Sequence, residues 1–205
     1  LDTSWRMHPD ICGFISDAVY DGRLLAHPDC ARQRLHLAAG HDPALAETGI
    51  RFVAMDHTGC GQRSAEEVAR VKELAESLIG TPFTDRNGET ATLRWKNILI
   101  VAPYNMQVNA LAAALPSAAR VGTVDKFQGQ EAEVVIVSLA TSTPDDLPRH
   151  VEFFYSKNRI NVAISRARTL ALVVANPKLL ELDAKSVDHL RLVNTLAWVA
   201  KEGKL

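Results

Sequence analysis

The sequence predicts an α/β domain with a mainly parallel sheet and helices on both of its faces. The segments with strand character are apolar almost throughout, which is typical of parallel strands covered on both sides. Amphipathic helical patterns alternate with them over about 150 residues, as in a doubly wound sheet. The 205 residues are 47% hydrophobic and 23% charged, which suits one buried core. We therefore expect residues 1–205 to form a single domain.

Five segments are predicted strands, because they are apolar and rich in β-branched residues. They are residues 49–55, 97–102, 119–124, 132–140 and 169–175. Four helices are predicted from apolar residues on one face, over 64–79, 104–115, 157–167 and 186–201. Ser64 and Glu67 predict a capping box at the start of the first of these. Pro9 predicts an earlier helix that continues to Val19.

Two segments interrupt this pattern, residues 21–47 and 142–157, and both are expected to be loop insertions. The first contains three histidines and a cysteine whose spacing fits no standard zinc site, so we expect no metal. They are His27, Cys30, His36 and His41.

Composition indicates the compartment and the kind of partner. The chain has a net charge of −1, so a nucleic acid would have to meet a local basic patch. Its three cysteines form no C-x-x-C pair, which favours a reducing, cytoplasmic compartment. No apolar run is long enough for a membrane span, so no membrane partner is expected. The chain begins without Met, and we expect it to be a fragment of a longer protein.

Common nucleotide motifs are absent from the sequence. There is no G-x-x-x-x-G-K-S/T loop to hold phosphates and no G-x-G-x-x-G turn. No apolar strand ends in an Asp-Glu pair that would hold magnesium, and no G-x-S-x-G elbow is present. By itself the chain therefore lacks the groups for phosphoryl transfer, and it would supply half of a site.

Two polar loops follow predicted strands, where ligands bind in parallel sheets. In "VAPYNMQ" (101–107), Pro103 and Tyr104 open a helix, either as packing residues or as an edge that grips a nucleic-acid backbone. In "VGTVDKFQGQE" (121–131), hydroxyl, amide and charged groups crowd into nine residues. Such groups suit phosphate and sugar contacts, although Gly129 could simply supply a positive φ.

Arginines occur beside both a helix start and a strand start. Arg6 stands just before the helix at Pro9, as an ordinary exposed side chain or as a bidentate phosphate ligand. Arg159 and Arg166 are seven residues apart and share one helical face, whereas Arg168 lies about 200° round from Arg166. Arg166 in a last turn either complements the helix dipole or reaches a ligand.

Four motifs, taken in order, resemble those of the second RecA-like domain of superfamily 1 helicases, most closely the DNA2/Upf-like branch. They are "WRMHP" (5–9), "VAPYNMQ" (101–107), "VGTVDKFQGQE" (121–131) and "NRINVAISRAR" (158–168). Trp5 stands where a tyrosine is commoner in that family. The chain is also similar to the C-terminal part of bacterial proteins that join such a helicase to a RecB-like nuclease.

This resemblance implies a three-layer RecA-like fold and a motor of two RecA-like halves. ATP with Mg²⁺ would bind between the halves, held mainly by the first half, which carries the Walker elements. The implied partners are single-stranded DNA or RNA and the N-terminal RecA-like domain of the same protein. Residues 1–205 alone are then expected to show no ATPase activity.

The resemblance also assigns site residues. Arg6 and Arg166 would contact the γ-phosphate as catalytic residues, and Glu131 with Gly129 would complete the nucleotide site beside the ribose. Single-stranded nucleic acid would be gripped through its backbone by two loops. The residues in question are Pro103, Tyr104, Asn105, Gln107, Thr123, Asp125 and Gln128.

Two other function classes stay open at this level. An inactive RecA-like module could bind nucleic acid or a protein without turnover, and a Walker A sequence upstream would argue against it. A small-molecule α/β enzyme would need a nucleophile with its base or a cofactor fingerprint, and the motifs supply neither.

Overall fold

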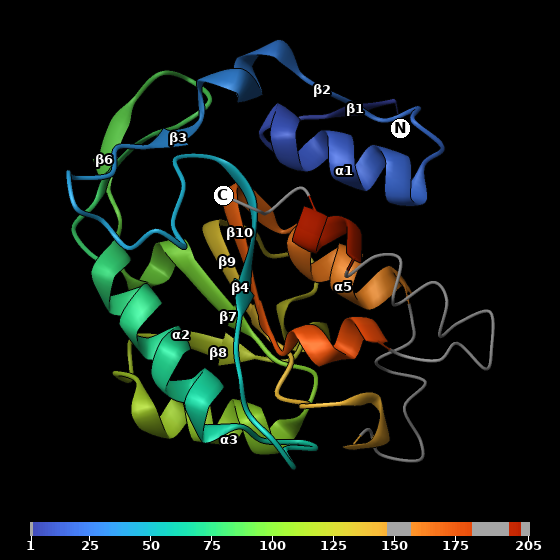
Figure 1. The fold of residues 1–205 in the computed structure, drawn as a ribbon. Coiled ribbons are helices and arrows are strands. Elements are labelled where there is room, and N and C mark those ends of the chain that lie inside the picture. Colours follow the sequence, from blue (N-terminus) through green and yellow to red (C-terminus); the bar gives the residue numbers. More distant parts are fainter. Residues whose placement is uncertain (1, 147–156, 182–196, 202–205) are drawn as a thin grey trace.

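The computed structural model describes residues 2–146, 157–181 and 197–201. Its centre is a five-stranded sheet in the order β4-β10-β9-β7-β8, with every neighbouring pair parallel (Figure 1). The strands are β4 (Gly49–Ala54), β7 (Ile98–Val101), β8 (Arg120–Gly122), β9 (Ala132–Ser138) and β10 (Ala167–Ala175). All five predicted strands are confirmed, with small shifts at their ends.

The central strands are apolar over most of their length because both of their faces are covered. In β9, Val135 and Val137 belong to one apolar core, whereas Val134 and Ile136 belong to the other. Alternate residues of a strand point to opposite faces, so a strand between two cores needs apolar residues at every position. This explains why the sequence lacks polar–apolar alternation here.

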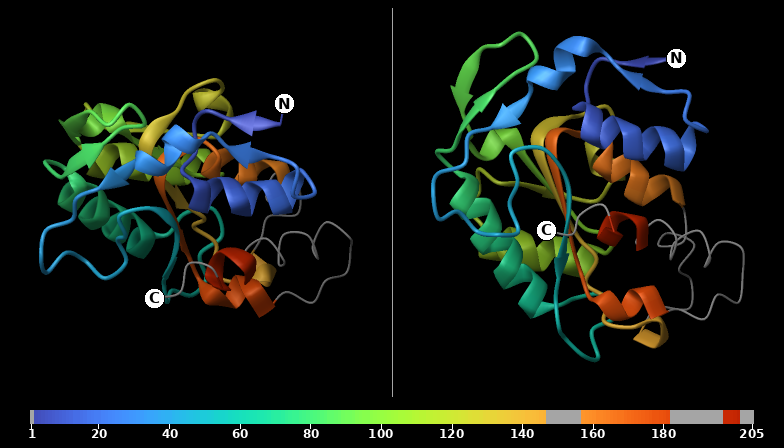
Figure 2. Two further views of the ribbon diagram at one scale, coloured as in Figure 1. Left: turned by 90° about the horizontal axis from the view of Figure 1, so that it is seen from above. Right: turned by 45° about the horizontal axis from the view of Figure 1, so that its top comes forward.

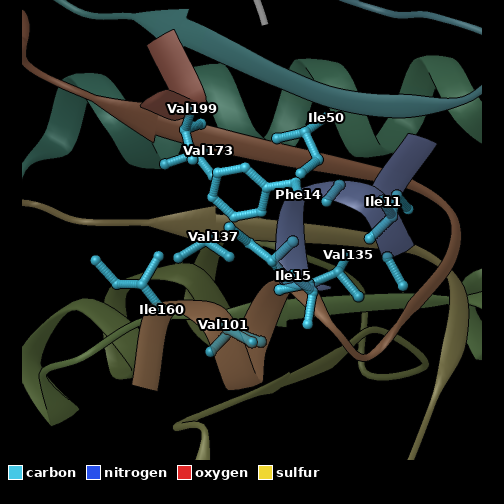
Figure 3. Close-up of a cluster of buried hydrophobic side chains, with 14 of the residues drawn as sticks. Ile11, Phe14, Ile15, Ile50, Val101, Val135, Val137, Ile160, Val173 and Val199 are labelled. Atoms are coloured by element: carbon cyan, nitrogen blue, oxygen red, sulfur yellow. The ribbon is translucent and has the colours of Figure 1, made fainter. Parts of the chain in front are cut away.

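Helices cover both faces of the sheet and complete three layers (Figure 2). On one face lie α1 (Pro9–Val19) and α5 (Lys157–Ile164), and on the other α2 (Ala65–Leu78) and α3 (Asn105–Ala114). Figure 3 shows Phe14 and Ile15 of α1 in one cluster with Val137 of β9 and Val173 of β10. The predicted α/β architecture with helices on both faces is thereby confirmed.

The helix starts follow the predicted signals in part. Pro9 begins α1, and His8 is its N-cap, with a side chain that accepts from the N–H of Asp10. Ser64 caps α2 by accepting a hydrogen bond from the N–H of Glu67. The Glu67 side chain does not return to Ser64, because it is buried in a separate polar network described below.

Two predicted elements differ from the structure or lie partly outside it. The helix predicted over 157–167 ends at Ile164, so Arg166 lies in a turn and Arg168 lies in β10. The positions of Arg166 and Arg168 relative to Arg159 are therefore not set by helical spacing. Each of the three arginines nevertheless has its own contacts, described below. Of the helix predicted over 186–201, residues 197–201 are helical, and the rest lies outside the described residues. Most of the predicted loop 142–157 also lies outside them.

The predicted loop 21–47 contains short elements and helps to build two small sheets. Its first strand, β2 (Leu25–Ala26), pairs in parallel with β1 (Thr3–Ser4). Its second, β3 (Arg34–Leu35), adds to an unpredicted hairpin of β5 (Pro82–Thr84) and β6 (Thr90–Thr92). The turn of that hairpin contains an Asn-Gly pair, with Gly88 at φ +85°, which is a common hairpin signal.

Candidate nucleotide and nucleic-acid sites

A carboxylate held by two arginines lies at the amino end of β9. Glu131 immediately precedes that strand, and its Oε2 accepts a hydrogen bond of 2.5 Å from Nε of Arg6. Its Oε1 accepts from Nε of Arg168 at 3.2 Å, and Nη1 of Arg168 also donates to Glu133 at 2.8 Å. We call Arg6, Glu131 and Arg168 the charge cluster.

The charge cluster lies at the opposite edge of the sheet from the loops that follow strands. Glu131 precedes β9 and Arg168 is the second residue of β10, and both strands run in the same direction. From the sequence, the ligand-binding residues are expected past the carboxyl ends of the strands. The structure instead separates the candidate residues into a group at the amino edge and a group at the carboxyl edge.

Electrostatics favour the charged form of Glu131. Burial opposes its ionisation, but hydrogen bonds from Arg168 and Arg6 outweigh burial and lower its pKa from the ordinary value. Burial also acts against the charge of Arg168, yet its carboxylate partners raise the pKa of that guanidinium. The cluster is therefore an ion network in which the side chains of Arg6 and Arg168 are both more than a third exposed.

The lowered pKa of Glu131 predicts a pH dependence of folding stability. A carboxyl group with a lowered folded-state pKa stabilises the fold above its unfolded pKa, and this contribution is lost as pH falls through the folded pKa. The Glu131→Gln variant should therefore lose less stability than the wild type between roughly pH 5 and pH 3. Urea unfolding at a series of pH values measures this, with the exposed Glu89→Gln as control. Equal pH slopes in wild type and Glu131→Gln would contradict it.

Arg166 is buried beneath the segment that joins β8 to β9. It is 6% exposed, and its Nη1 and Nη2 donate to the carbonyls of Gln130 and Val124 at 3.2 and 3.3 Å. Its Nε has no hydrogen-bond partner within the described part of the chain. Burial and the positive charge of Arg6 lower the pKa of Arg166. The adjacent Gly129 has φ +77°, so the predicted left-handed turn is present, directly before the Gln130 carbonyl.

One residue that the sequence analysis missed positions the arginines. Gln33 is 3% exposed, and its Nε2 donates to the carbonyl of Arg6 at 2.9 Å and, more weakly, to that of Arg168 at 3.4 Å. The N–H of His8 also donates to the Arg168 carbonyl at 2.7 Å. These bonds tie the segment before α1 to the start of β10. Gln33 lies in the segment read as a loop insertion, and its type alone gives no signal.

An open cavity of about 640 Å³ borders the charge cluster. Its polar wall includes Arg6, Glu131 and Arg86 of the β5–β6 turn, whose Nη1 donates to the Trp5 carbonyl at 2.7 Å. Trp5 is 54% exposed and stacks on His27, with ring centroids 3.4 Å apart. Charge and an exposed aromatic ring beside one cavity suit a nucleotide better than an apolar ligand.

A second group of candidate residues lies at the carboxyl edge of the sheet. Pro103 follows β7 and Thr123 follows β8, and the pairing of Val101 with Gly122 places these turns side by side. Asn105 and Gln128 are exposed, as a contact with a nucleic acid requires. Tyr104 is half-buried and packs against the apolar core.

The carboxylate and the amide predicted to grip nucleic acid have other partners. Asp125 pairs with Arg159 of α5 at 3.3 Å, so it orients a cation at this edge. Gln107 is fully buried, and its amide bonds the backbone of Ser64 and the hydroxyl of Ser138. This burial argues against a direct contact between Gln107 and nucleic acid. Its amide ties the start of α3 to Ser64, the N-cap of α2, and to Ser138 of β9.

A family model for the AAA domain (AAA_12) matches residues 1–178. The chain belongs to the AAA domain family. It is 30% identical over 200 residues to the DNA-binding protein SMUBP-2 of Mesocricetus auratus, covering 96% of this chain and 19% of that protein. It is 29% identical to the DNA polymerase alpha-associated DNA helicase A of Saccharomyces cerevisiae, covering 88% of this chain and 28% of that protein. These findings support a RecA-like domain of the superfamily 1 helicase type.

The AAA domain also resembles solved structures. A structure described as that of the PRRSV helicase matches with a TM-score of 0.37 and 20% identity, over 86% of this chain and 23% of that one. The chain thus spans about a fifth of the length of the first relatives it matches.

A buried polar network stands between α2 and the end of β9 in this AAA domain. Glu67 accepts from the hydroxyl of Ser138 at 2.6 Å and from the N–H of Ala140 at 2.9 Å. His57 lies between Glu67, 3.0 Å from its Nε2, and Ser142, 2.7 Å from its Nδ1. A carboxylate only accepts hydrogen bonds, so Nε2 of His57 is the donor to Glu67.

This network resembles a serine–histidine–carboxylate triad in composition. Its serine, Ser142, is fully buried, as is Glu67, and His57 is 4% exposed. No substrate can reach a nucleophile in that position. The network therefore holds the loops after β4 and β9 together, and it does not support the small-molecule enzyme alternative.

Two further properties concern metals and membranes. Across residues 2–146, 157–181 and 197–201, no three His, Cys, Asp or Glu side chains gather as a metal site would require. No helix in those ranges is long and apolar enough to cross a bilayer.

Proposed function

We propose that this AAA domain is the second motor domain of an ATP-dependent helicase or translocase. One observation carries the proposal: at one edge of the sheet, the Glu131 carboxylate is held between Arg6 and Arg168, and Arg166 lies buried nearby. An Arg-rich edge without a phosphate-binding loop completes a nucleotide site whose other half lies on another domain. The N-terminal RecA-like domain of the same protein would supply that half.

Each residue at this edge has a distinct task in the proposed reaction. Arg6 is partly exposed and would contact the γ-phosphate, while Glu131 fixes its orientation. Arg166 would stabilise negative charge that develops on the transferred phosphoryl group. Mg²⁺, held mainly by the other domain, would offset further phosphate charge when ATP is bound. Glu131 and the Gly129 turn would lie beside the sugar.

The carboxyl edge would hold the nucleic acid. Hydroxyl and amide groups of Thr123, Asn105 and Gln128 would bond phosphates and sugars of a single strand, beside the rigid turn at Pro103. Tyr104 packs under this turn, and Asp125 would act through Arg159 rather than touch a phosphate itself. This division replaces the direct contacts expected for Asp125 and Gln107.

The full protein is expected to hydrolyse ATP faster when single-stranded nucleic acid is present. The Thr123→Val/Asn105→Ala double variant should lose most of that stimulation. Each lost hydrogen bond lowers strand affinity by roughly three- to tenfold, which anisotropy with labelled oligo-dT and oligo-rU measures directly. Comparing the two strands also tells DNA from RNA.

The matched control is Asn87→Ala, an exposed amide at the tip of the β5–β6 hairpin. It should leave strand affinity unchanged. Residues 1–205 alone should show no turnover. If single-stranded nucleic acid stimulates ATP hydrolysis by the double variant as strongly as by the wild type, the proposed nucleic-acid contacts are rejected. A full protein without ATPase activity would favour the alternative, an inactive module that binds nucleic acid or protein.

The branch of the helicase superfamily and the kind of parent protein are also part of the proposal. The motif order supports a place in the DNA2/Upf-like branch and, within it, a bacterial protein that carries a RecB-like nuclease. The sequence upstream of Leu1 tests both, through a Walker A loop and nuclease motifs.

A further inference from the structure

The hairpin of β5 and β6 places an exposed arginine in the wall of the cavity beside the charge cluster. Arg86 lies at the tip of this hairpin and lines the cavity together with Arg6 and Glu131. The hairpin belongs to the small antiparallel sheet that includes β3, apart from the central sheet (Figure 2). The cavity therefore receives guanidinium groups from two segments that are far apart in the sequence.

Hydrogen bonds fix the turn that carries Arg86. A carboxylate oxygen of Asp85 accepts from the N–H of Asn87 at 2.8 Å and from the N–H of Glu89 at 2.9 Å. The N–H of Gly88, whose φ is +85°, donates to the Asp85 carbonyl at 3.1 Å. The carboxylate nearest to Arg86 in the sequence is thus bound by backbone donors, and the turn holds Arg86 at a defined place.

The Arg86 guanidinium is anchored at the cavity wall by a single printed contact of its fork. Its Nη1 donates to the Trp5 carbonyl at 2.7 Å, and a guanidinium has five N–H donors. No carboxylate in residues 2–146, 157–181 and 197–201 forms an ion pair with Arg86, in contrast to Arg23, which pairs with Asp21. Arg86 therefore has donors and charge left for a ligand.

The cavity wall carries an excess of positive charge. Its charged lining residues are Arg6, Arg86 and Glu131, and the Glu131 carboxylate is also bonded by Arg168. A wall with more guanidinium groups than carboxylates favours an anionic ligand. Guanidinium groups bind phosphate oxygens through paired hydrogen bonds, so a ligand with several phosphates suits this wall.

The contacts of the two lining arginines place them at different positions along the wall. The Arg6 side chain bonds Glu131 at 2.5 Å and the Ser165 carbonyl at 3.2 Å. Arg86 instead bonds the carbonyl of Trp5. A triphosphate whose γ-phosphate meets Arg6 therefore presents a different phosphate to Arg86.

We propose that Arg86 binds the α- or β-phosphate of the nucleotide, a contact that ATP and ADP share. This inference rests on the proposed function, because it requires that the cavity at the charge cluster receives the nucleotide. It assigns the β5–β6 hairpin a part in nucleotide binding. The hairpin would hold ADP as well as ATP, whereas Arg6 and Arg166 act on the γ-phosphate.

The test is Arg86→Gln in the full protein, because glutamine keeps a donor for the Trp5 carbonyl and removes the charge. The Kd for ADP, measured by isothermal titration calorimetry, should rise about tenfold. This is the lower end of the range for a lost hydrogen bond to a charged group, since the side chain is exposed. The KM for ATP should rise by a similar factor, with a smaller effect on kcat.

Salt and a neighbouring variant separate a phosphate contact from a structural role. The difference in ADP affinity between the wild type and Arg86→Gln should shrink as salt is raised from about 0.05 M to about 0.5 M, because salt screens exposed charges. The matched control is Asn87→Ala in the same turn, which should keep the wild-type Kd. Both side chains are exposed, so both urea midpoints should stay near that of the wild type.

The outcomes separate this inference from the function on which it rests. An equal loss of ADP affinity in Arg86→Gln and Asn87→Ala would assign the effect to the shape of the hairpin and overturn the proposal. A loss that does not change with salt would overturn it as well. A wild type that binds neither ATP nor ADP would overturn the proposed function itself, whereas equal ADP binding by the wild type and Arg86→Gln would overturn this inference alone.

Discussion

Replacing Arg166 by Ala in the full protein should lower strand-stimulated ATP hydrolysis by about 10³-fold or more, the range for an arginine that stabilises phosphoryl-transfer charge. The reason is electrostatic, because a guanidinium in a low-dielectric site offsets developing phosphate charge more strongly than water does. ATPase rates with saturating strand measure the effect. Binding of ATP should change far less than kcat, since this interaction strengthens in the transition state.

The control for Arg166 is Arg23→Ala, an exposed arginine paired with Asp21, which should keep the wild-type rate. Loss of the Arg166 bonds to Val124 and Gln130 will lower stability somewhat, so circular dichroism must show that the variant is folded. Wild-type turnover in folded Arg166→Ala would reject the arginine assignment while leaving the fold and family intact.

Glu67→Ala is expected to destabilise the domain by about 3–5 kcal/mol, because each buried donor left without an acceptor costs about 1–3 kcal/mol. The carboxylate is fully buried and accepts from Ser138, Ala140 and His57, so its loss leaves three buried donors unpaired. Urea unfolding monitored by tryptophan fluorescence measures the change.

Glu76→Ala is the matched control, because it removes a carboxylate from the same helix at an exposed position, where it pairs with Lys72 at 4.0 Å. Surface pairs contribute little, so its midpoint should stay near that of the wild type. A similar midpoint for Glu67→Ala and Glu76→Ala would show that the buried network does not hold the loops after β4 and β9.

The fold was predictable because its signals are local and strong. Runs such as 134–137 are apolar at every position, since β9 lies between two cores, and Pro9 and Ser64 mark helix starts. The β5–β6 hairpin was missed although Asn87-Gly88 is a hairpin signal, because its strands have three residues each and β6 is fully exposed. The end of α5 was misplaced because the apolar period continues into β10.

The pairing of the candidate site residues was not predictable from the sequence. Motif order pointed to Arg6, Glu131 and Arg166, but only the fold shows that Arg6 and Arg168 share one carboxylate over a separation of more than a hundred residues. The roles of Gln33 and Gln107 depend on burial and on partners far away in the chain. No local pattern encodes such contacts.

The two carbonyls that hold Arg166 belong to the same segment that follows Thr123 and leads to Glu131. A guanidinium has five donors in a rigid fork, so turning it toward a phosphate would release Val124 and Gln130. The backbone that faces the strand would then loosen as the nucleotide is engaged. By thermodynamic reciprocity, a strand that prefers the loosened segment must tighten nucleotide binding by the same factor. Arg166 would thus couple the two sites, because nucleotide and strand both change the bonds that it makes to this segment.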